Sequence, residues 1–214
     1  MKKSQVSATV IRRLPRYYRY LTDLTAAGIS KISSKELAEK MGVTASQIRQ
    51  DLNCFGGFGQ QGYGYNVELL RQEIGAILGV DKNYNAILIG VGNLGHAIAN
   101  HVKFEKRGIN LIGIFDINEK IVGQKIKGIK IKHSSELEDF CKQYNPKIAV
   151  LTLAKTETEN MMEKLCDLGV KGFWNFANME LKPPSEDITV VNVHLGDSLM
   201  TLCYDIKEKN SIKE

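Results

Sequence analysis

One glycine pattern constrains the fold of this chain more than any other feature. The apolar run Ala86–Ile89 leads directly into a G-x-G-x-x-G sequence, and a helical pattern follows. A strand that passes through these glycines into a helix is the signature of a dinucleotide-binding domain. We expect all six residues of the pattern at the cofactor: Gly90, Val91, Gly92, Asn93, Leu94 and Gly95.

Each glycine of this pattern has its own predicted role. Gly90 permits the tight turn, Gly92 lets the backbone approach a pyrophosphate, and Gly95 lets helix and strand pack closely. The first N–H groups of the helix would bind the phosphates. Asp116 ends the next strand-like run, 21 residues after Gly95, where an acidic residue bonds the ribose hydroxyls. Because a carboxylate there repels a 2′-phosphate, we expect NADH and NAD+ as ligands.

From Asn85 onward, short apolar runs alternate with helical stretches, which predicts a parallel sheet with helices on both faces. The expected strands are Ala86–Ile89, Leu111–Phe115, Ile129–Ile131, Ile148–Leu153, Gly172–Trp174 and Thr189–Val193. The expected helices are Leu94–Lys106, Ser135–Tyr144, Thr158–Leu168 and Leu195 to about Lys209. The fold class is therefore α/β, with a Rossmann-type parallel sheet over residues 81–214.

The first 80 residues differ from the rest in charge. They hold 11 basic and 6 acidic residues, whereas the remaining 134 hold 18 of each, so the whole net charge of +5 lies in the first part. Such an asymmetry indicates a polyanionic partner such as nucleic acid. Taken alone, it is also typical of an ordinary solvated surface.

The apolar spacing of this basic part predicts a helix from Val6 to Ala27, ended by Gly28. Its apolar residues recur at gaps of three and four, which is helical spacing. Pro15 interrupts the pattern, so we expect either two turns that meet there or a helix that starts at the proline. Four arginines of this segment are expected at DNA phosphates: Arg12, Arg13, Arg16 and Arg19.

Two capping-box patterns follow, Ser33 with Glu36 and Thr44 with Gln47, and Gly42 lies between the helices that they open. Helix, tight turn and helix form a helix-turn-helix. The second helix would read base edges from the major groove, because arginine pairs with guanine and glutamine with adenine. The residues that it turns outward are Ser46, Gln47, Arg49 and Gln50.

A glycine-rich segment, GGFGQQGYGY at 56–65, comes directly after the predicted recognition helix. Its density of glycines favours a hairpin, at the place where a winged helix has its wing, although a flexible loop is the alternative. The wing would add Gln60, Gln61 and Tyr63 to the DNA contacts. An amphipathic helix, Glu68–Leu78, then leads to a domain boundary at Gly79–Tyr84. We expect a winged-helix domain at 1–80 and a nucleotide-binding and dimerisation domain at 81–214.

Several classes of protein are disfavoured. No run approaches 18 apolar residues, so no membrane span is expected, and the basic N-terminal residues lack the apolar stretch of a secretory signal. The four cysteines stand far apart without a C-x-x-C pair, which argues against a zinc site or a disulfide framework. We therefore expect a cytoplasmic protein with reduced thiols and no metal.

An enzyme is also disfavoured. A dehydrogenase needs a region that holds substrate and a general acid or base near the nicotinamide. The 134 residues after the basic part are about enough for the nucleotide domain alone. His96 and His101 lie on the helix after the glycine pattern, where a surface or packing role is commoner than catalysis. No catalytic residue is expected.

With both halves considered, the sequence resembles the redox-sensing transcriptional repressors of the Rex family. The resemblance extends from about Gln5 to Lys207. It rests on RLPRYYRYL at 13–21, TASQIRQDLNCFG at 44–56, GFGQQGYGYNV at 57–67, GVGNLG at 90–95, FD at 115–116, NFA at 175–177 and VVNVHL at 190–195. The NFA segment adds Asn175 and Phe176 to the expected cofactor site.

The resemblance implies a homodimer that binds palindromic operator DNA and represses fermentation and respiration genes when NADH is scarce. NADH would close the dimer and release the DNA, while NAD+ would compete weakly or favour DNA binding. The resemblance further implies that the C-terminal helix is swapped between subunits.

The sequence departs from the pattern of the family in three places. The wing has Gln60 and Gln61 where many members carry lysine or arginine. His101 stands where a tyrosine is common, and His194 where an aspartate is usual. The contact that these last two groups make across the dimer in some members therefore does not carry over. Two alternative functions remain: an NAD-dependent oxidoreductase with an N-terminal oligomerisation module, and a DNA-binding protein that uses NAD only structurally.

Overall fold

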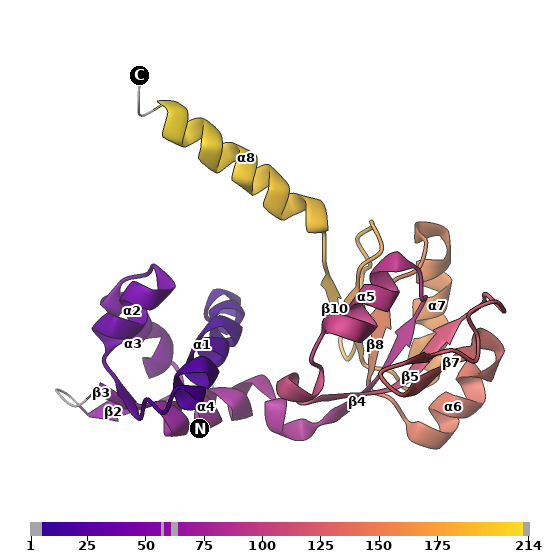
Figure 1. Cartoon of the computed structure of the whole chain (residues 1–214), viewed down its shortest axis with the longest axis horizontal. Coiled ribbons are helices and arrows are strands. Elements are labelled where there is room, and N and C mark those ends of the chain that lie inside the picture. Colours follow the sequence, from indigo (N-terminus) through magenta and orange to yellow (C-terminus); the bar gives the residue numbers. More distant parts are fainter. Residues whose placement is uncertain (1–5, 57, 61–63, 212–214) are drawn as a thin grey trace. The chain divides into compact units, whose positions relative to one another are not determined.

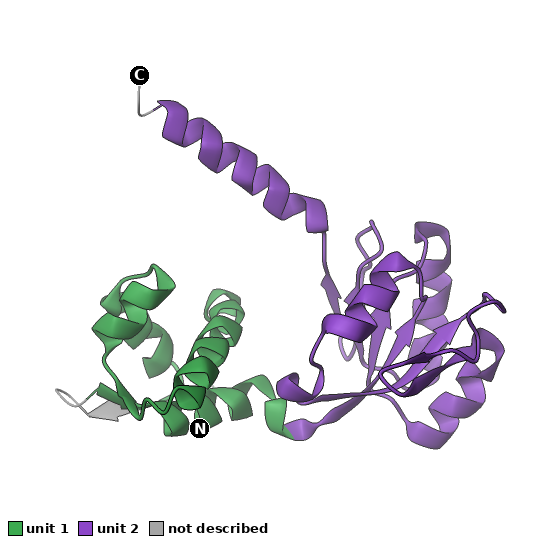
Figure 2. Ribbon diagram, in the orientation of Figure 1, with its two compact units in different colours: residues 1–81 green, residues 82–214 purple. Residues whose placement is uncertain are grey.

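The computed structural model describes residues 6–56, 58–60 and 64–211, with the backbone alone at 59 and 60. The predicted DNA contacts Gln61 and Tyr63, and the side chain of Gln60, lie outside the described residues. The chain divides into two compact units, residues 1–81 and 82–214 (Figure 2).

Unit 1 is a winged helix-turn-helix. Its elements are α1 (Ala8–Ala26), β1 (Lys31–Ile32), α2 (Ser34–Met41), α3 (Ala45–Asn53), β2 (Gly59–Gln60), β3 (Gly64–Asn66) and α4 (Val67–Leu78) (Figure 1). The strands form a small antiparallel sheet in the order β1-β3-β2. The hairpin β2–β3 is the predicted wing. At the start of β3, Gly64 has φ +72°, and an added Cβ would lie 2.7 Å from the Ile32 carbonyl oxygen, so only glycine fits.

Both expectations for Pro15 were wrong, because α1 is one helix of 19 residues that continues through the proline. Pro15 lacks the N–H that would bond the Ile11 carbonyl one turn earlier. Its neighbours on the inner face compensate, since Leu14 and Tyr17 are fully buried. Tertiary packing thus overrides a local helix breaker.

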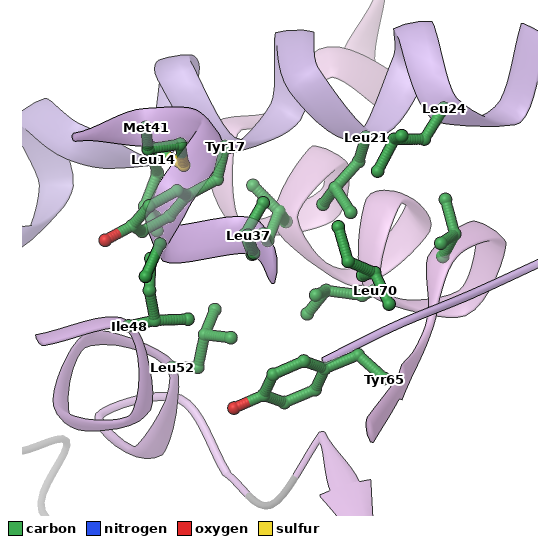
Figure 3. Packing of buried hydrophobic residues seen from close by; sticks show 14 residues of the cluster. Leu14, Tyr17, Leu21, Leu24, Leu37, Met41, Ile48, Leu52, Tyr65 and Leu70 are labelled. Carbon is green, nitrogen blue, oxygen red and sulfur yellow. The ribbon is translucent and has the colours of Figure 1, made fainter. Parts of the chain in front are cut away.

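The core of unit 1 joins all four helices and the sheet (Figure 3). Apolar residues three and four positions apart line the inner face of each helix. The buried side chains include Leu14, Tyr17, Leu21 and Leu24 of α1, Leu37 and Met41 of α2, Ile48 and Leu52 of α3, Leu70 of α4 and Tyr65 of β3.

Unit 2 contains a seven-stranded sheet in the order β10-β9-β8-β4-β5-β7-β6. Its strands are β4 (Tyr84–Ile89), β5 (Ile109–Asp116), β6 (Lys125–Ile126), β7 (Ile129–His133), β8 (Ile148–Leu151), β9 (Gly172–Asn175) and β10 (Thr189–Asn192). Its helices are α5 (Asn93–His101), α6 (Leu137–Tyr144), α7 (Lys155–Asp167) and α8 (Leu195–Ser211). Short 3-10 turns lie at Val80–Lys82, Glu105–Arg107 and Ser134–Glu136.

All neighbouring strands of this sheet are parallel except β6, which pairs antiparallel with β7. Helices cover both faces, as Figure 1 shows. Ile87 and Ile89 belong to the cluster that includes buried residues of α6 and α7, whereas Leu88 belongs to the cluster with α5. Such alternation follows from the two-residue period of a strand.

Two elements of unit 2 differ from the sequence-based prediction. Helix α5 ends at His101 rather than near Lys106, because Val102 is extended and Phe104 turns into the core. The hairpin β6–β7 was not expected. Lys127 and Gly128 at its tip both have positive φ, as a two-residue hairpin turn requires.

Helix α8 is unlike the other helices because none of its residues is buried. Leu195 and Leu199 are each 62% exposed, and Ile206 is 52% exposed. Among the described residues, no helix combines the length and the apolar character that crossing a bilayer requires.

Candidate nucleotide site and nucleic-acid interface

The order in which the chain adds strands to the sheet of unit 2 reverses between β4 and β8. From β4 the chain continues to β5 and β7 on one side, and later to β8, β9 and β10 on the other side. Open α/β sheets bind ligands at the carboxyl ends of the strands that border such a switch point. Gly90 follows β4, Thr152 follows β8 and Asp116 ends β5, so all three lie at this edge.

The structure shows a different physical reason for glycine at each of the three positions of the pattern. Gly90 has φ +92°, and an added Cβ would lie 2.8 Å from the Thr152 carbonyl oxygen. At Gly95 a Cβ would collide with the Gly90 carbonyl oxygen, so the close packing of α5 on the loop requires glycine. At Gly92 a Cβ would meet nothing within 4 Å. Packing within the chain therefore does not require a glycine at position 92. A ligand that approaches the backbone at this position would require one, because a side chain would stand in its way.

Helix α5 begins at this loop with Gly92 as its N-cap, and no side chain caps it. The first N–H groups of a helix lack partners within the helix and carry a partial positive charge. Asn93 and Leu94 occupy its first turn. The arrangement suits a phosphate group.

Asp116 lies against the glycine loop. Its Oδ2 accepts a hydrogen bond from Val91 N at 2.5 Å, and its Oδ1 accepts one from Asn118 N at 2.7 Å. A carboxylate has about four acceptor positions, so these bonds leave capacity for hydroxyl donors. The carboxylate thus holds the loop and remains suited to bind a ribose.

Thr152 braces the same loop, and the sequence pattern did not single it out. Its hydroxyl donates to the Gly90 carbonyl oxygen at 2.6 Å, with the Ile89 carbonyl oxygen at 3.1 Å as a second acceptor. Only the pairing of β4 with β8 brings Thr152 to residues more than 60 positions earlier.

Asn175 and Phe176 follow at the end of β9. The Asn175 side chain is fully buried, and its Nδ2 donates to Met179 O at 2.9 Å and to Asn192 Oδ1 at 2.8 Å. Its Oδ1 accepts from Ala177 N at 3.0 Å. Both amide protons of Asn175 are therefore engaged within the protein, and its contact with the cofactor stays a prediction. Phe176 is partly buried and packs edge-on against Trp174, with ring centroids 4.6 Å apart.

Three of the four predicted phosphate contacts on α1 are exposed: Arg12, Arg16 and Arg19. Their spacing of four and three places them on one face of the helix. Arg13 is different, because its Nε and Nη2 donate to the Asp51 carboxylate at 2.6 and 2.7 Å. That bidentate bond ties α1 to α3.

On α3, the side chains of Ser46, Arg49 and Gln50 are exposed. The Nη1 of Arg49 donates to Ser34 Oγ at 3.0 Å. Gln47 is half-buried, and its Nε2 donates to Asp51 Oδ1 at 2.8 Å.

The two predicted capping boxes differ in outcome. At α2 the box is complete, since Glu36 N donates to Ser33 Oγ and Ser33 N to Glu36 Oε2. At α3 only half of it forms: Gln47 N donates to Thr44 Oγ1 at 3.1 Å, while the side-chain amide of Gln47 turns to Asp51. The expectation of a second full box was therefore wrong.

Asp51 is the centre of a network that the sequence pattern did not reveal. Burial alone raises the pKa of this carboxyl, but the hydrogen bonds from Arg13, Tyr17 and Gln47 outweigh that effect and lower the pKa below its usual range. Burial and the bond to Asp51 raise the pKa of Tyr17. The carboxylate is therefore ionised at neutral pH.

The two histidines that depart from the family pattern lie in unit 2. His101 is exposed at the end of α5, and His194 Nε2 lies 2.8 Å from Glu180 Oε1. In the part of the chain that the structure describes, no cluster of histidine, cysteine or carboxylate side chains could hold a metal ion.

Comparisons with known proteins agree with this division into two sites. A family model described as a putative DNA-binding protein N-terminus matches residues 5–53, and a model described as a CoA binding domain matches residues 81–179. The redox-sensing transcriptional repressor Rex of Thermoanaerobacter pseudethanolicus is 52% identical over 213 residues, which cover all of this chain and 95% of the relative. The chain belongs to the Rex family.

The Rex repressor of Clostridium novyi is also 52% identical, over 95% of this chain and 96% of the relative. Among solved structures, the Rex-family repressor RSP in complex with β-NAD+ and operator DNA has a TM-score of 0.88 at 52% identity, covering 98% of this chain and 96% of that one. RSP in complex with β-NADH has a TM-score of 0.88 at 49% identity, with 98% of each chain covered.

These comparisons confirm the resemblance to the Rex family. They also confirm the expected fold of a DNA-binding N-terminal part and a Rossmann-like C-terminal part. The Rex relatives are transcriptional repressors and not enzymes, which argues against the oxidoreductase alternative.

Proposed function

We propose that this chain is an NADH-responsive transcriptional repressor that acts in the cytoplasm. It binds palindromic operator DNA as a homodimer and releases the DNA when NADH binds. The observation that carries the proposal is the presence of two sites in one chain: a winged helix with exposed arginines, and a glycine loop at the switch point of a Rossmann-type sheet. The ligands of the related repressor RSP, operator DNA with NAD+ and NADH alone, support it.

The residues of the DNA interface have distinct roles in this proposal. Arg12, Arg16 and Arg19 bind phosphates, which positions the protein without reading the sequence. Ser46, Gln47, Arg49 and Gln50 face base edges in the major groove, and the wing with Gln60, Gln61 and Tyr63 lies along an adjacent groove.

The residues of the nucleotide site bind NADH and NAD+. The backbone from Gly90 to Gly95 holds the pyrophosphate, because the N-terminus of α5 is uncapped. Asp116 binds the ribose hydroxyls. Phe176 borders the nicotinamide, and an apolar surrounding there disfavours the positively charged ring of NAD+ relative to the neutral ring of NADH.

Helix α8 supports the homodimer. Leu195, Leu199, Leu202 and Ile206 follow one another at gaps of four, three and four, so they share one face, and all are more than half exposed. A contiguous exposed apolar face indicates a partner surface. We assign that surface to a second copy of the chain, with α8 swapped onto it.

The dimer is tested with Leu199→Glu, which places a charge on this face, and with Thr201→Glu on the opposite face as the matched control. Light scattering after size-exclusion chromatography should show a monomer for Leu199→Glu and a dimer for Thr201→Glu. A dimeric Leu199→Glu variant would refute the assignment of α8.

The repressor function is tested by the coupling between the two ligands. The full-length protein first selects its duplex from a randomised DNA pool, and calorimetry then measures NADH and NAD+ affinity with and without that duplex. Coupling is reciprocal, so the duplex must weaken NADH binding by the factor by which NADH weakens DNA binding. Equal NADH affinity in both measurements would refute the switch, and an absence of selected DNA would refute DNA binding.

A further inference from the structure

A single carboxylate in the core of unit 1 collects four hydrogen bonds. Asp51 on α3 is 1% exposed. Its Oδ2 accepts from Arg13 Nε at 2.6 Å and from the Tyr17 hydroxyl at 2.6 Å. Its Oδ1 accepts from Arg13 Nη2 at 2.7 Å and from Gln47 Nε2 at 2.8 Å. The acceptor capacity of the carboxylate is therefore filled.

Such a network joins two helices at a high cost in desolvation free energy. The Asp51 carboxylate is buried, whereas the Arg13 side chain is still 29% exposed. The network therefore has to offset mainly the desolvation of the Asp51 charge, and apolar residues of similar volume often give equal or higher stability at such a site. Leu14, Ile48 and Leu52 already pack α1 and α3 into one core. Stability alone does not explain why Asp51 is there.

What the carboxylate adds is a fixed orientation of the Gln47 amide. The two ends of a glutamine amide are nearly the same in shape and differ only in hydrogen bonding. An ionised carboxylate accepts but never donates, so the Nε2 end of Gln47 has to face Asp51. One N–H and the Oε1 of Gln47 remain for a partner.

Gln47 is only half-buried, so part of its side chain is accessible to a partner. Gln47 is in the first turn of the helix, beside exposed Ser46 and one turn before exposed Gln50. A glutamine recognises adenine with one N–H on N7 and its oxygen on the N6 amino group. An amide that is free to flip presents these two groups in either order, whereas an anchored amide presents one order only.

We propose that Asp51 is a specificity-determining positioning residue of the DNA interface, which anchors the Gln47 amide in the order that reads a base edge. The proposal rests on the DNA-binding function proposed above. It also assigns Arg13 to the support of Asp51 instead of to phosphate binding, because two of its nitrogens are committed to the carboxylate.

The first variant is Asp51→Asn in the full-length protein. Asparagine keeps the size of the side chain, but its amide both donates and accepts, so Gln47 loses its fixed orientation. The assay measures the affinity for the selected duplex and for all its single-base-pair variants. Gln47→Ala identifies the position that Gln47 reads, as the position where its discrimination is lost.

Asp51→Asn should lose discrimination at that same position, by about 5-fold or more, since a bidentate contact contributes on the order of 5- to 150-fold against a wrong base. Discrimination at the other positions should stay as in the wild type. Combining Asp51→Asn with Gln47→Ala should cause no further loss at that position, because both changes remove the same contact. Arg49→Ala, as the matched control, should lose discrimination at a different position.

A second variant tests the same proposal if the Asp51→Asn protein does not fold. The triple substitution Arg13→Met, Tyr17→Phe and Asp51→Leu replaces the whole network by apolar residues of similar size, which preserves stability in comparable buried networks. Circular dichroism and thermal melting establish that it is folded. It should show the same position-specific loss as Asp51→Asn.

Three results would overturn the proposal. The first is wild-type discrimination at the Gln47 position in either folded variant, and the second is a Gln47→Ala variant that loses discrimination nowhere. The third is a loss spread evenly over all positions, which a merely structural role of Asp51 would produce. If the wild-type protein selects no duplex at all, the DNA-binding function itself fails, so the two failures are distinguishable.

Discussion

Replacing Gly92 by alanine should weaken NADH binding without unfolding unit 2. Gly92 has φ −67°, which any residue adopts, and an added Cβ would meet no atom of the chain within 4 Å. Alanine is a poorer N-cap than glycine, at a cost of less than about 1 kcal/mol. The methyl group would instead stand where the pyrophosphate approaches the backbone. One methyl group forced into a tight contact costs about 1–3 kcal/mol, which is roughly a 5- to 150-fold loss of affinity.

Gly95→Ala is the matched comparison, since the same methyl group there meets the protein itself. Its Cβ would collide with the Gly90 carbonyl oxygen and lie 2.6 Å from Thr152 Oγ1. Overpacking of this kind costs about 1–3 kcal/mol, and the better helix propensity of alanine returns up to about 1 kcal/mol. Because the collision is with a backbone atom, the cost should lie in the upper part of this range, about 2–3 kcal/mol. A net loss of about 1–2 kcal/mol in the free energy of unfolding should then lower the Tm by roughly 3–10 °C.

Calorimetric titration with NADH and thermal melting of the ligand-free proteins separate the two effects. Gly92→Ala should weaken NADH binding and lower the Tm of the ligand-free protein less than Gly95→Ala does. If Gly92→Ala binds NADH as tightly as the wild type, the ligand does not approach this backbone. If both variants melt at the same reduced temperature, the geometric distinction between the two glycines is wrong.

Three further outcomes are expected. Arg16→Ala should weaken binding to all DNA sequences alike and reduce the slope of log affinity against log salt by about 0.9, measured by fluorescence anisotropy at several salt concentrations; an unchanged slope would exclude a phosphate contact. Pro15→Ala should restore a hydrogen-bond donor inside α1 and raise the free energy of unfolding of unit 1 by about 1–2 kcal/mol in urea denaturation, and lower stability would show that the proline fits its site. Because the folded pKa of Asp51 lies below its ordinary value of 3.8, its stabilising effect is complete above that value and is lost as the pH falls through the folded pKa. The stability difference between wild type and Asp51→Asn, from urea unfolding at pH 2.5–7, should therefore shrink below about pH 4, and a constant difference would contradict the ionised state.

Much of unit 2 was predictable because its strands are buried on both faces. Such strands appear as continuous apolar runs, and β4, β5 and β8 overlap the predicted segments. The hairpin strand β6 has only two residues, Lys125–Ile126, which is too short to produce any periodic signal. The same limit applies to β1 and β2 in unit 1.

The nucleotide site was predictable where it is contiguous in sequence. Gly90–Gly95 and Asp116 belong to one strand–helix–strand unit, so their spacing alone identifies them. Thr152 comes from a strand that the sheet order places beside β4, and no local pattern marks a threonine as a brace for a distant loop. Which strands become neighbours depends on the packing of the whole sheet, and that information is not local.

Gln47 shows why a correct local pattern can still misplace a side chain. The sequence T-x-x-Q predicts that the glutamine reaches back to the Thr44 N–H, which is exposed and can bond water instead. Asp51 stands one turn after Gln47, and its carboxylate is buried by α1, so an unmade bond there would leave a charged acceptor without water. Hydrogen bonds to a charged group are about twice as strong as neutral ones, and the amide therefore turns to Asp51. Because the burial of Asp51 depends on Arg13 and Tyr17, 34 and more residues away, only the folded unit decides which of the two partners Gln47 takes.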